Sequence, residues 1–263
     1  MKIGFIGCGN MANAIISGII KYQGDNNQIF GYDCYTPALE KCAKIYKINA
    51  CKSESDVVNN SDIIFIAVKP NNLEDVLKEI SWAITNEHIL ISICAGKTIE
   101  FIQEAINTEC KIVRVMPNIN AKVGEAISAY CHNDKATQTD CDAVENLLKC
   151  TGKVIKLDEK HFPIFGVIGG CAPAFSYMFI DELARAGVKY GMKKDEALYV
   201  AAQTVYGSAK MILESDEHPY KLIDNVCSPG GTTIEGVMSL QNDGFDKAVH
   251  NAVKSAVEKD SKL

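Results

Sequence analysis

A glycine-rich segment near the start of the chain has residue types and spacing that bind phosphate. It runs from Gly7 to Ala12 as Gly7-Cys8-Gly9-Asn10-Met11-Ala12, directly after the apolar run Ile3–Ile6. Gly7 permits a tight turn, Gly9 lets the backbone approach a pyrophosphate, and Ala12 allows close packing of a helix on a strand. Free N–H groups and the positive end of the helix dipole then favour an anion. The segment predicts a dinucleotide-binding cradle, and a purely structural glycine turn is the alternative.

An acidic residue, Asp33, ends the next apolar run, Ile29–Tyr32. A carboxylate at this place hydrogen-bonds the adenine-ribose hydroxyls and repels the additional phosphate of NADP. We therefore expect Asp33 to favour NADH. The alternative is that Asp33 only caps the turn into a helix after Pro37, since Asp is a favoured turn residue.

Two further strand-like runs end in segments that belong at the same edge of a sheet. One ends in Ala67-Val68-Lys69-Pro70 and the other ends in Ala95-Gly96. Ligands bind at the carboxyl edge of a doubly wound sheet, so we assign all six residues to the cofactor. For Lys69 the alternative is a solvated loop lysine, the usual environment of that residue type.

A second candidate for anion binding lies near the C-terminus. There Ser228-Pro229-Gly230-Gly231 leads into Thr232-Thr233 at the expected start of a helix. Backbone N–H groups gathered in this way bind a small anion, and a substrate carboxylate fits. The same residues could also form only a turn and an N-cap.

Alternating apolar runs and helical patterns predict the elements that position these segments. Apolar runs are followed by Gly, Pro or Asn at Ile63–Val68, Ile89–Ala95 and Lys111–Met116, and helical patterns surround Met11–Lys21 and Pro37–Tyr46. This order is typical of β-α-β units in a doubly wound parallel sheet. We expect an α/β domain of Rossmann type at residues 1–160 and an all-α domain at 161–263.

The predicted helices of the second half are apolar around most of their circumference. Phe175–Tyr190 and Asp195–Glu214 have few charges on their central turns. A domain of about a hundred residues cannot bury such helices alone, so we expect another subunit to cover them. The alternative is a compact monomeric bundle.

Composition narrows the range of partners. The net charge of −6 leaves no basic stripe for a duplex, which argues against nucleic-acid binding. The 11 cysteines are scattered and form no Cys-x-x-Cys pair, so we expect reduced thiols. The five histidines do not cluster with Cys or with each other, so no metal site is expected.

The N-terminus opens into a strand pattern at Lys2–Ile6 and lacks the regions of a signal peptide. No apolar run approaches the ~18 residues that a membrane span needs. We therefore expect a cytoplasmic protein without a membrane partner.

Taken together, these segments resemble the pyrroline-5-carboxylate reductase family over the whole length of the chain. The resemblance rests on five segments, of which the last is the most specific: Ile3–Met11, Ala67–Pro70, Val113–Asn118, Ala201–Val205 and Cys227–Thr233. It implies an N-terminal domain that binds NADPH or NADH and a helical domain that dimerises and often builds a decamer. The chain departs from the family pattern at Gly170–Phe175, where a serine and a tyrosine hydroxyl are missing, so no role is assigned to those hydroxyls.

The resemblance also implies a reaction: hydride transfer to the C5=N carbon of 1-pyrroline-5-carboxylate, which gives L-proline in the last step of its biosynthesis. The Ser228–Thr233 loop, with Gly230, Gly231 and Thr232, would hold the substrate carboxylate, and the Thr233 hydroxyl would lie near the ring nitrogen. Asp33 differs from the small polar residues that the family often has there, so the resemblance does not decide the cofactor.

Two other functions stay open. A β-hydroxyacid dehydrogenase shares the glycine opening and a helical second domain, but it needs a catalytic lysine, and none lies between Gly166 and Ala186. A non-catalytic dinucleotide-binding protein would keep the fold without turnover.

Overall fold

The computed structural model describes residues 1–24 and 28–260. It divides into two compact units, an N-terminal unit of Met1–Gly170 with Asp260 and a C-terminal unit of Cys171–Lys259. The chain thus separates ten residues after the predicted boundary between 160 and 161, inside the helical segment rather than before it. Residues 261–263 of the predicted second domain lie outside the described residues.

An eight-stranded sheet forms the centre of the N-terminal unit, in the order β3-β2-β1-β4-β5-β6-β7-β8. The strands are β1 Lys2–Ile6, β2 Gln28–Tyr32, β3 Asn49–Ala50, β4 Ile63–Ile66, β5 Ile89–Ser92, β6 Lys111–Met116, β7 Ala126–His132 and β8 Gly152–Lys156. Neighbouring strands run parallel except β6 and β7, which are antiparallel. The doubly wound sheet is confirmed, with one antiparallel pair and three strands (β3, β7 and β8) that the apolar runs did not predict.

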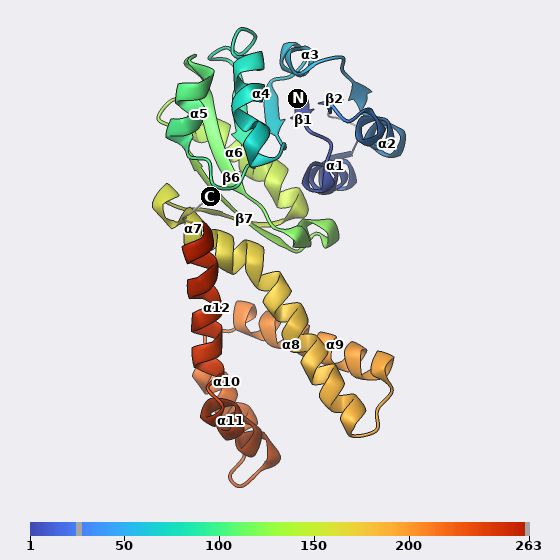
Figure 1. The fold of residues 1–263 in the computed structure, drawn as a ribbon, viewed down its shortest axis with the longest axis vertical. Helices are drawn as coiled ribbons and strands as arrows, with labels where there is room; N and C mark the ends of the chain where they lie inside the picture. Colours follow the sequence, from blue (N-terminus) through green and yellow to red (C-terminus); the bar gives the residue numbers. More distant parts are fainter. Residues whose placement is uncertain (25–27, 261–263) are drawn as a thin grey trace. The chain divides into compact units, whose positions relative to one another are not determined.

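Helices cover both faces of this sheet (Figure 1). Ile3 and Phe5 of β1 pack in one core with α1 (Asn10–Gln23), α2 (Thr36–Tyr46) and α6 (Gln138–Leu148). Ile6 joins a second core with α3 (Glu54–Asn59), α4 (Leu73–Ile80) and α5 (Ile99–Ile106). Alternate strand residues therefore point into two cores, as a sheet buried on both faces requires.

Short helical segments connect and extend this sheet. They are the 3₁₀ helices η2 (Pro70–Asn72), η3 (Ile119–Val123), η4 (Lys149–Thr151) and η5 (Glu159–His161), the short α7 (Phe162–Phe165) and a π-helical turn, η6 (Gly166–Cys171). An ion pair and a ring contact anchor η5 and α7 to the sheet, because Arg114 Nη1 on β6 lies 2.8 Å from Glu159 Oε1 and the guanidinium lies 4.6 Å from the Phe162 ring. Asn118 Nδ2 also donates to the Gly169 carbonyl at 2.9 Å.

All the regular secondary structure in the described residues of the C-terminal unit is helical. It contains α8 (Ala172–Lys189), α9 (Lys194–Glu214), α10 (Pro219–Val226), α11 (Thr232–Asn242) and α12 (Phe245–Asp260). The two predicted long helices are confirmed within three residues at each end. They pack closely, because a Cβ on Gly187 would lie 2.9 Å from the Ala197 Cβ.

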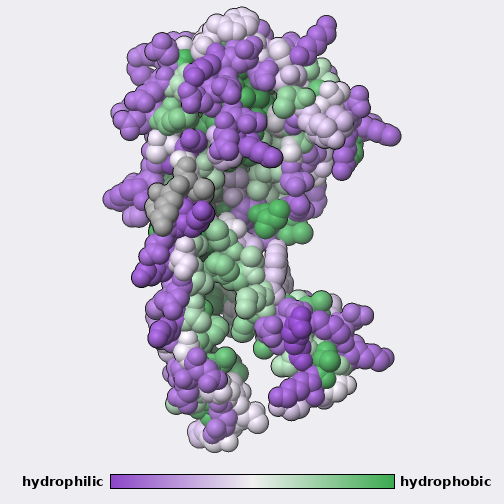
Figure 2. Space-filling model, in the orientation of Figure 1, coloured by the Kyte–Doolittle hydropathy of each residue, from purple (hydrophilic) through white to green (hydrophobic). Residues whose placement is uncertain are grey.

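Large apolar side chains on these helices are exposed in the single chain. Met178 on α8 is 70% exposed, and on α9 Tyr199 is 74% and Leu213 85% exposed. Hydrophobic residues gather over the α8 and α9 region in Figure 2. Monomeric surfaces rarely carry apolar patches of this extent, so the exposure indicates an interface.

One helical stretch, Glu159–Lys189, is long and apolar enough to cross a membrane by length and composition alone. The expectation that no apolar run approaches the length of a membrane span was wrong. Small and polar residues interrupt the apolar ones in this stretch, but its mean hydropathy remains as high as that of a membrane-spanning helix. Helices that are apolar around most of their circumference also occur where protein covers them, so this composition does not by itself indicate a membrane.

Candidate functional site

The glycine-rich loop joins β1 to α1 at the point where the strand order reverses between β1 and β4. Gly7 has φ +99°, and a Cβ there would lie 2.5 Å from the Ala67 carbonyl oxygen. Only glycine tolerates both the conformation and this close approach. Ala12 is 1% exposed and belongs to the core beneath α1. The loop therefore has the tight turn and the close helix packing that the sequence predicts.

The N-terminus of α1 is open to a ligand. Gly9 is its N-cap and no side chain caps the helix. A Cβ at Gly9 would meet no atom within 4 Å. Asn13 Nδ2 donates to the carbonyls of Cys8 and Gly9 at 2.6 and 2.7 Å, which fixes the loop on the helix. The uncapped N–H groups and the helix dipole then favour an anion such as a pyrophosphate.

A cavity of about 470 Å³ adjoins this loop at the carboxyl ends of β1, β2 and β4. Six of the predicted cofactor residues line it: Gly7, Gly9, Asp33, Ala67, Val68 and Lys69. Residues that the sequence did not single out also line it, among them Tyr35, Glu54 and Asn72. The cavity thus brings together segments far apart in the sequence.

The remaining predicted cofactor residues do not line this cavity. Cys8 is buried beneath the loop, Met11 packs on the core, and Asn10 lines a neighbouring cavity of about 370 Å³. Pro70 begins η2, directly after Lys69. Ala95 and Gly96 are exposed after β5, and Gly96 has φ +73°.

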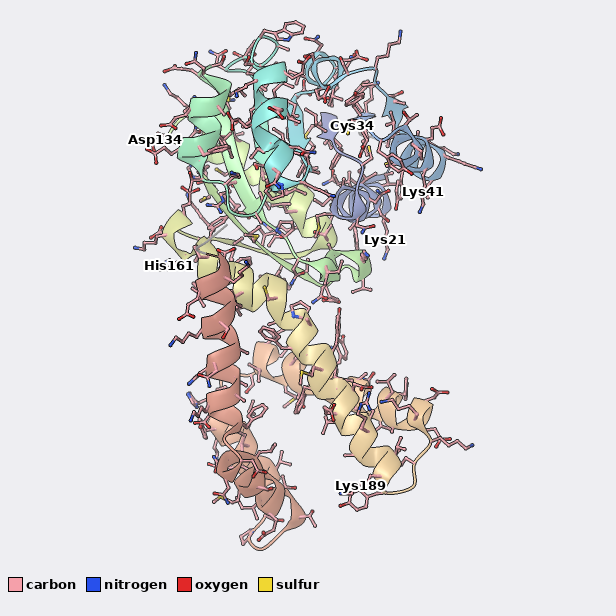
Figure 3. The ribbon with its side chains drawn as sticks, viewed as in Figure 1. Lys21, Cys34, Lys41, Asp134, His161 and Lys189 are labelled. Carbon is pink, nitrogen blue, oxygen red and sulfur yellow. The ribbon has the colours of Figure 1, made fainter. Side chains whose placement is uncertain are left out.

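The Asp33 carboxylate connects the two loops at the edge of the cavity. Its Oδ2 accepts from the Cys8 backbone N–H at 2.7 Å, and its Oδ1 accepts from the Tyr35 N–H at 2.8 Å. The turn-capping alternative is therefore present as a hydrogen bond. Each carboxylate oxygen retains a second lone pair, which leaves Asp33 able to accept from a ribose hydroxyl as well. Cys34, labelled in Figure 3, follows it and is exposed.

Two buried cysteines beside the cofactor loops, Cys8 and Cys94, are not poised as nucleophiles. The side-chain hydrogen bond with Cys42, followed by burial, raises the pKa of the Cys8 thiol far above its ordinary value. Burial also raises the pKa of Cys94, which follows β5. Thiols in this state are inert, so Cys8 has a packing role beneath the cradle.

The Ser228–Thr233 segment forms a second open helix N-terminus, in the C-terminal unit. Gly230 has φ +67°, and the Gly231 N–H donates to the Ser228 carbonyl at 3.0 Å, which closes a turn. Gly231 is the N-cap of α11 and no side chain caps that helix. Thr232 and Thr233 lie exposed in its first turn. The predicted substrate residues thus form one turn and the first helical residues after it.

The described residues contain no group of three or more His, Cys, Asp or Glu side chains that could hold a metal ion. All 11 cysteines fall within them and are free thiols.

A doubly wound sheet, a glycine loop at its switch point and an acid after β2 define a dinucleotide-dependent oxidoreductase. Two family models match the chain. Residues 2–96 match one described as NADP oxidoreductase coenzyme F420-dependent, and residues 159–263 match one described as Pyrroline-5-carboxylate reductase dimerisation. The chain belongs to the pyrroline-5-carboxylate reductase family.

Relatives named pyrroline-5-carboxylate reductase match the full chain. It is 42% identical to that of Escherichia coli (strain K12), covering 100% of this chain and 98% of the relative, and 38% identical to that of Methanosarcina acetivorans, covering 100% and 97%. The family assignment excludes the β-hydroxyacid dehydrogenase alternative.

Solved structures of pyrroline-5-carboxylate reductases are also similar to this chain over its full length. A Plasmodium falciparum pyrroline carboxylate reductase with NADP bound has 35% identity and a TM-score of 0.87, covering 99% of this chain and 97% of its own. The Streptococcus pyogenes enzyme has 32% identity and a TM-score of 0.89, covering 100% and 99%. A prephenate dehydrogenase from Aquifex aeolicus, at 16% identity and a TM-score of 0.55, shares the fold alone.

Proposed function

We propose that this chain reduces 1-pyrroline-5-carboxylate to L-proline with a nicotinamide dinucleotide, the last step of proline biosynthesis. The observation that supports this most strongly is the pair of uncapped, glycine-led helix N-termini, at α1 and at α11. They occur in a chain 42% identical over its full length to an enzyme of that name. One N-terminus suits a pyrophosphate and the other a small carboxylate.

Most of the catalytic effect in this proposal comes from positioning. The bound nicotinamide supplies the hydride. Backbone N–H groups of the Ser228–Thr233 loop hold the substrate carboxylate, and the Thr233 hydroxyl lies near the ring nitrogen. Protonation of the imine makes its carbon electrophilic, so the residues need only fix geometry and keep the nitrogen hydrogen-bonded. No His-Asp or Lys dyad is required.

The cofactor residues in the proposal are those of the loop and the strand ends. Gly7, Cys8, Gly9, Asn10, Met11 and Ala12 form the pyrophosphate cradle; Ala67, Val68, Lys69, Pro70, Ala95 and Gly96 form the neighbouring strand ends. Asp33 bonds the adenine ribose, which favours NADH over NADPH. A relative in the same family has NADP bound, so family membership alone does not imply NADH. The preference for NADH proposed here rests on the residues of this chain.

The assembly and location are also part of the proposal. Residues 1–160 bind the dinucleotide, and residues 161–263 bind substrate and pair two subunits through their helices, with a decamer as the larger assembly. The exposed apolar faces of α8 and α9 and the match to a dimerisation model support the homodimer. The small-molecule reaction agrees with a cytoplasmic protein that has no membrane or nucleic-acid partner.

The test is oxidation of NADH and of NADPH by the purified protein with 1-pyrroline-5-carboxylate, alongside larger-ring imino acids. We expect turnover with the five-membered ring and a higher kcat/KM with NADH than with NADPH. Dinucleotide binding without turnover on any cyclic imine would instead support a non-catalytic protein.

A further inference from the structure

The charges that line the cofactor cavity are sorted along the edge of the sheet. Glu54 follows β3, Asp33 follows β2, and Lys69 follows β4. The strand order is β3-β2-β1-β4, so both carboxylates lie on one side of the glycine loop after β1 and the lysine lies on the other. In a doubly wound fold the adenine ribose lies on the β2 side of that loop. A phosphate on the ribose would therefore face the two carboxylates rather than Lys69.

Glu54 is free to act on a ligand in this cavity. It is half-buried at the first residue of α3, and no hydrogen bond or ion pair to its carboxylate occurs within residues 1–24 and 28–260. Its neighbours make the local capping bonds instead, since Ser53 Oγ accepts from the Asp56 N–H at 3.1 Å and Asp56 Oδ2 accepts from the Lys52 N–H at 2.9 Å. The Glu54 charge is thus not required to cap its own helix.

The charge of Glu54 also acts on a nearby group. Tyr32, at the end of β2, also lines the cavity. Burial raises the pKa of its hydroxyl, and Glu54 is the largest of the charges that raise it further, ahead of Cys34 and Asp33. A second anion placed beside Tyr32 would meet the same repulsion.

We infer that Glu54 is a second determinant of cofactor specificity, which acts with Asp33 to exclude the 2′-phosphate of NADPH and select NADH. This inference rests on the proposed function. The two carboxylates differ in role: Asp33 is held by the glycine loop and the turn, whereas Glu54 contributes mainly its charge. Removing the charge of Glu54 should therefore relax specificity without disturbing the cradle.

The test compares Glu54→Gln with the wild type and with a control variant, Glu87→Gln. Glu87 is exposed and lies just before β5, at the amino ends of the strands and therefore away from the cavity, so the control makes the same charge change elsewhere. Calorimetric titration of the full-length protein with NAD⁺ and with NADP⁺ measures binding without turnover. We expect Glu54→Gln to lower the Kd for NADP⁺ about tenfold while the Kd for NAD⁺ changes less than twofold. The preference of the wild type for NAD⁺ should also weaken as salt is raised from 0.05 to about 0.5 M.

A Kd for NADP⁺ that changes no more in Glu54→Gln than in Glu87→Gln would overturn the inference, as would a preference insensitive to salt. Failure of the proposed function would show differently, as absence of 1-pyrroline-5-carboxylate reduction with either dinucleotide. Thermal unfolding of both variants identifies a misfolded protein. If Glu54→Gln unfolds early, Glu54→Ser replaces it under the same criteria.

Discussion

Two glycines of the cradle make opposite structural demands although they lie two residues apart. Gly7 has a positive φ and no room for a side chain, whereas Gly9 has φ −75° and open space around its Cβ position. The first glycine is therefore required by the fold, and the second is required only if a ligand occupies that space.

This difference gives a paired prediction. Gly9→Ala should keep the free energy of unfolding within about 0.5 kcal/mol but raise the Kd for NADH about tenfold, because the methyl group occupies the space of the pyrophosphate. Gly7→Ala should lose about 2 kcal/mol of stability through backbone strain and contact with Ala67. Urea unfolding followed by Trp82 fluorescence and NADH titration measure both effects. Unchanged NADH affinity in Gly9→Ala would contradict the cradle.

Thr233 is the residue to which the proposed mechanism assigns a direct contact with the reacting ring. Thr233→Ala should lower kcat about tenfold to a hundredfold, since a hydrogen bond to a charged group is lost, with little change in NADH binding. Thr233→Ser keeps the hydroxyl and should retain most of the turnover. Steady-state kinetics of the two variants provide the measurement, and an unchanged kcat in Thr233→Ala would remove Thr233 from the mechanism.

At the scale of elements, the sequence predicts strands where both faces are buried. The runs Ile63–Ile66 and Ile89–Ser92 are fully buried, so their continuous apolar pattern is informative. β3 is two exposed residues, and β8 is a largely exposed strand with Lys153 and Lys156, so neither has such a pattern. β7 contains small and polar residues, including Ala126 and Ser128.

The same limit applies to the site. The glycine loop and Asp33 could be predicted because their meaning is local, a turn after a strand and before a helix. Glu54 could not be predicted as a site residue, because it reaches the cavity only when β3 pairs with β2, a strand that lies about 20 residues earlier in the chain. Pairing between distant short strands leaves no signature in a single sequence.

The link between β6 and η5 supports a prediction about stability. The Arg114 side chain is 6% exposed and its Nε has no partner among the described residues, so the carboxylate of Glu159 is its main compensation. Glu159→Ala should lower the free energy of unfolding of the N-terminal unit by about 2 kcal/mol. The loss is smaller than that expected on breaking a fully buried ion pair, because Glu159 is 31% exposed. Trp82 fluorescence during urea unfolding reports this unit.

Asp158→Ala is the matched control. Asp158 pairs with Lys160 at 3.3 Å, and both side chains are more than 70% exposed. Its loss should cost less than about 0.5 kcal/mol. Equal effects of the two substitutions would show that the Arg114 pair has no special role.

At the scale of the whole molecule, the exposed apolar faces of α8 and α9 predict an assembly. Light scattering on the purified protein should give at least twice the chain mass of 28.7 kDa. Leu213→Glu, at a side chain 85% exposed on α9, should shift the mass downward, whereas Trp82→Glu, at a residue 70% exposed in the N-terminal unit, should leave it unchanged. A wild-type monomer would contradict the interface and favour the compact bundle.

The central claim is that a cofactor held by the loop of α1 reduces an imine whose carboxylate is held by the loop of α11. Reduced dinucleotide deuterated at C4 of the nicotinamide tests it directly. In the presence of 1-pyrroline-5-carboxylate, mass spectrometry and NMR should find L-proline with one deuterium, located at C5. Absence of proline, or proline without deuterium from either C4 position, would contradict the account.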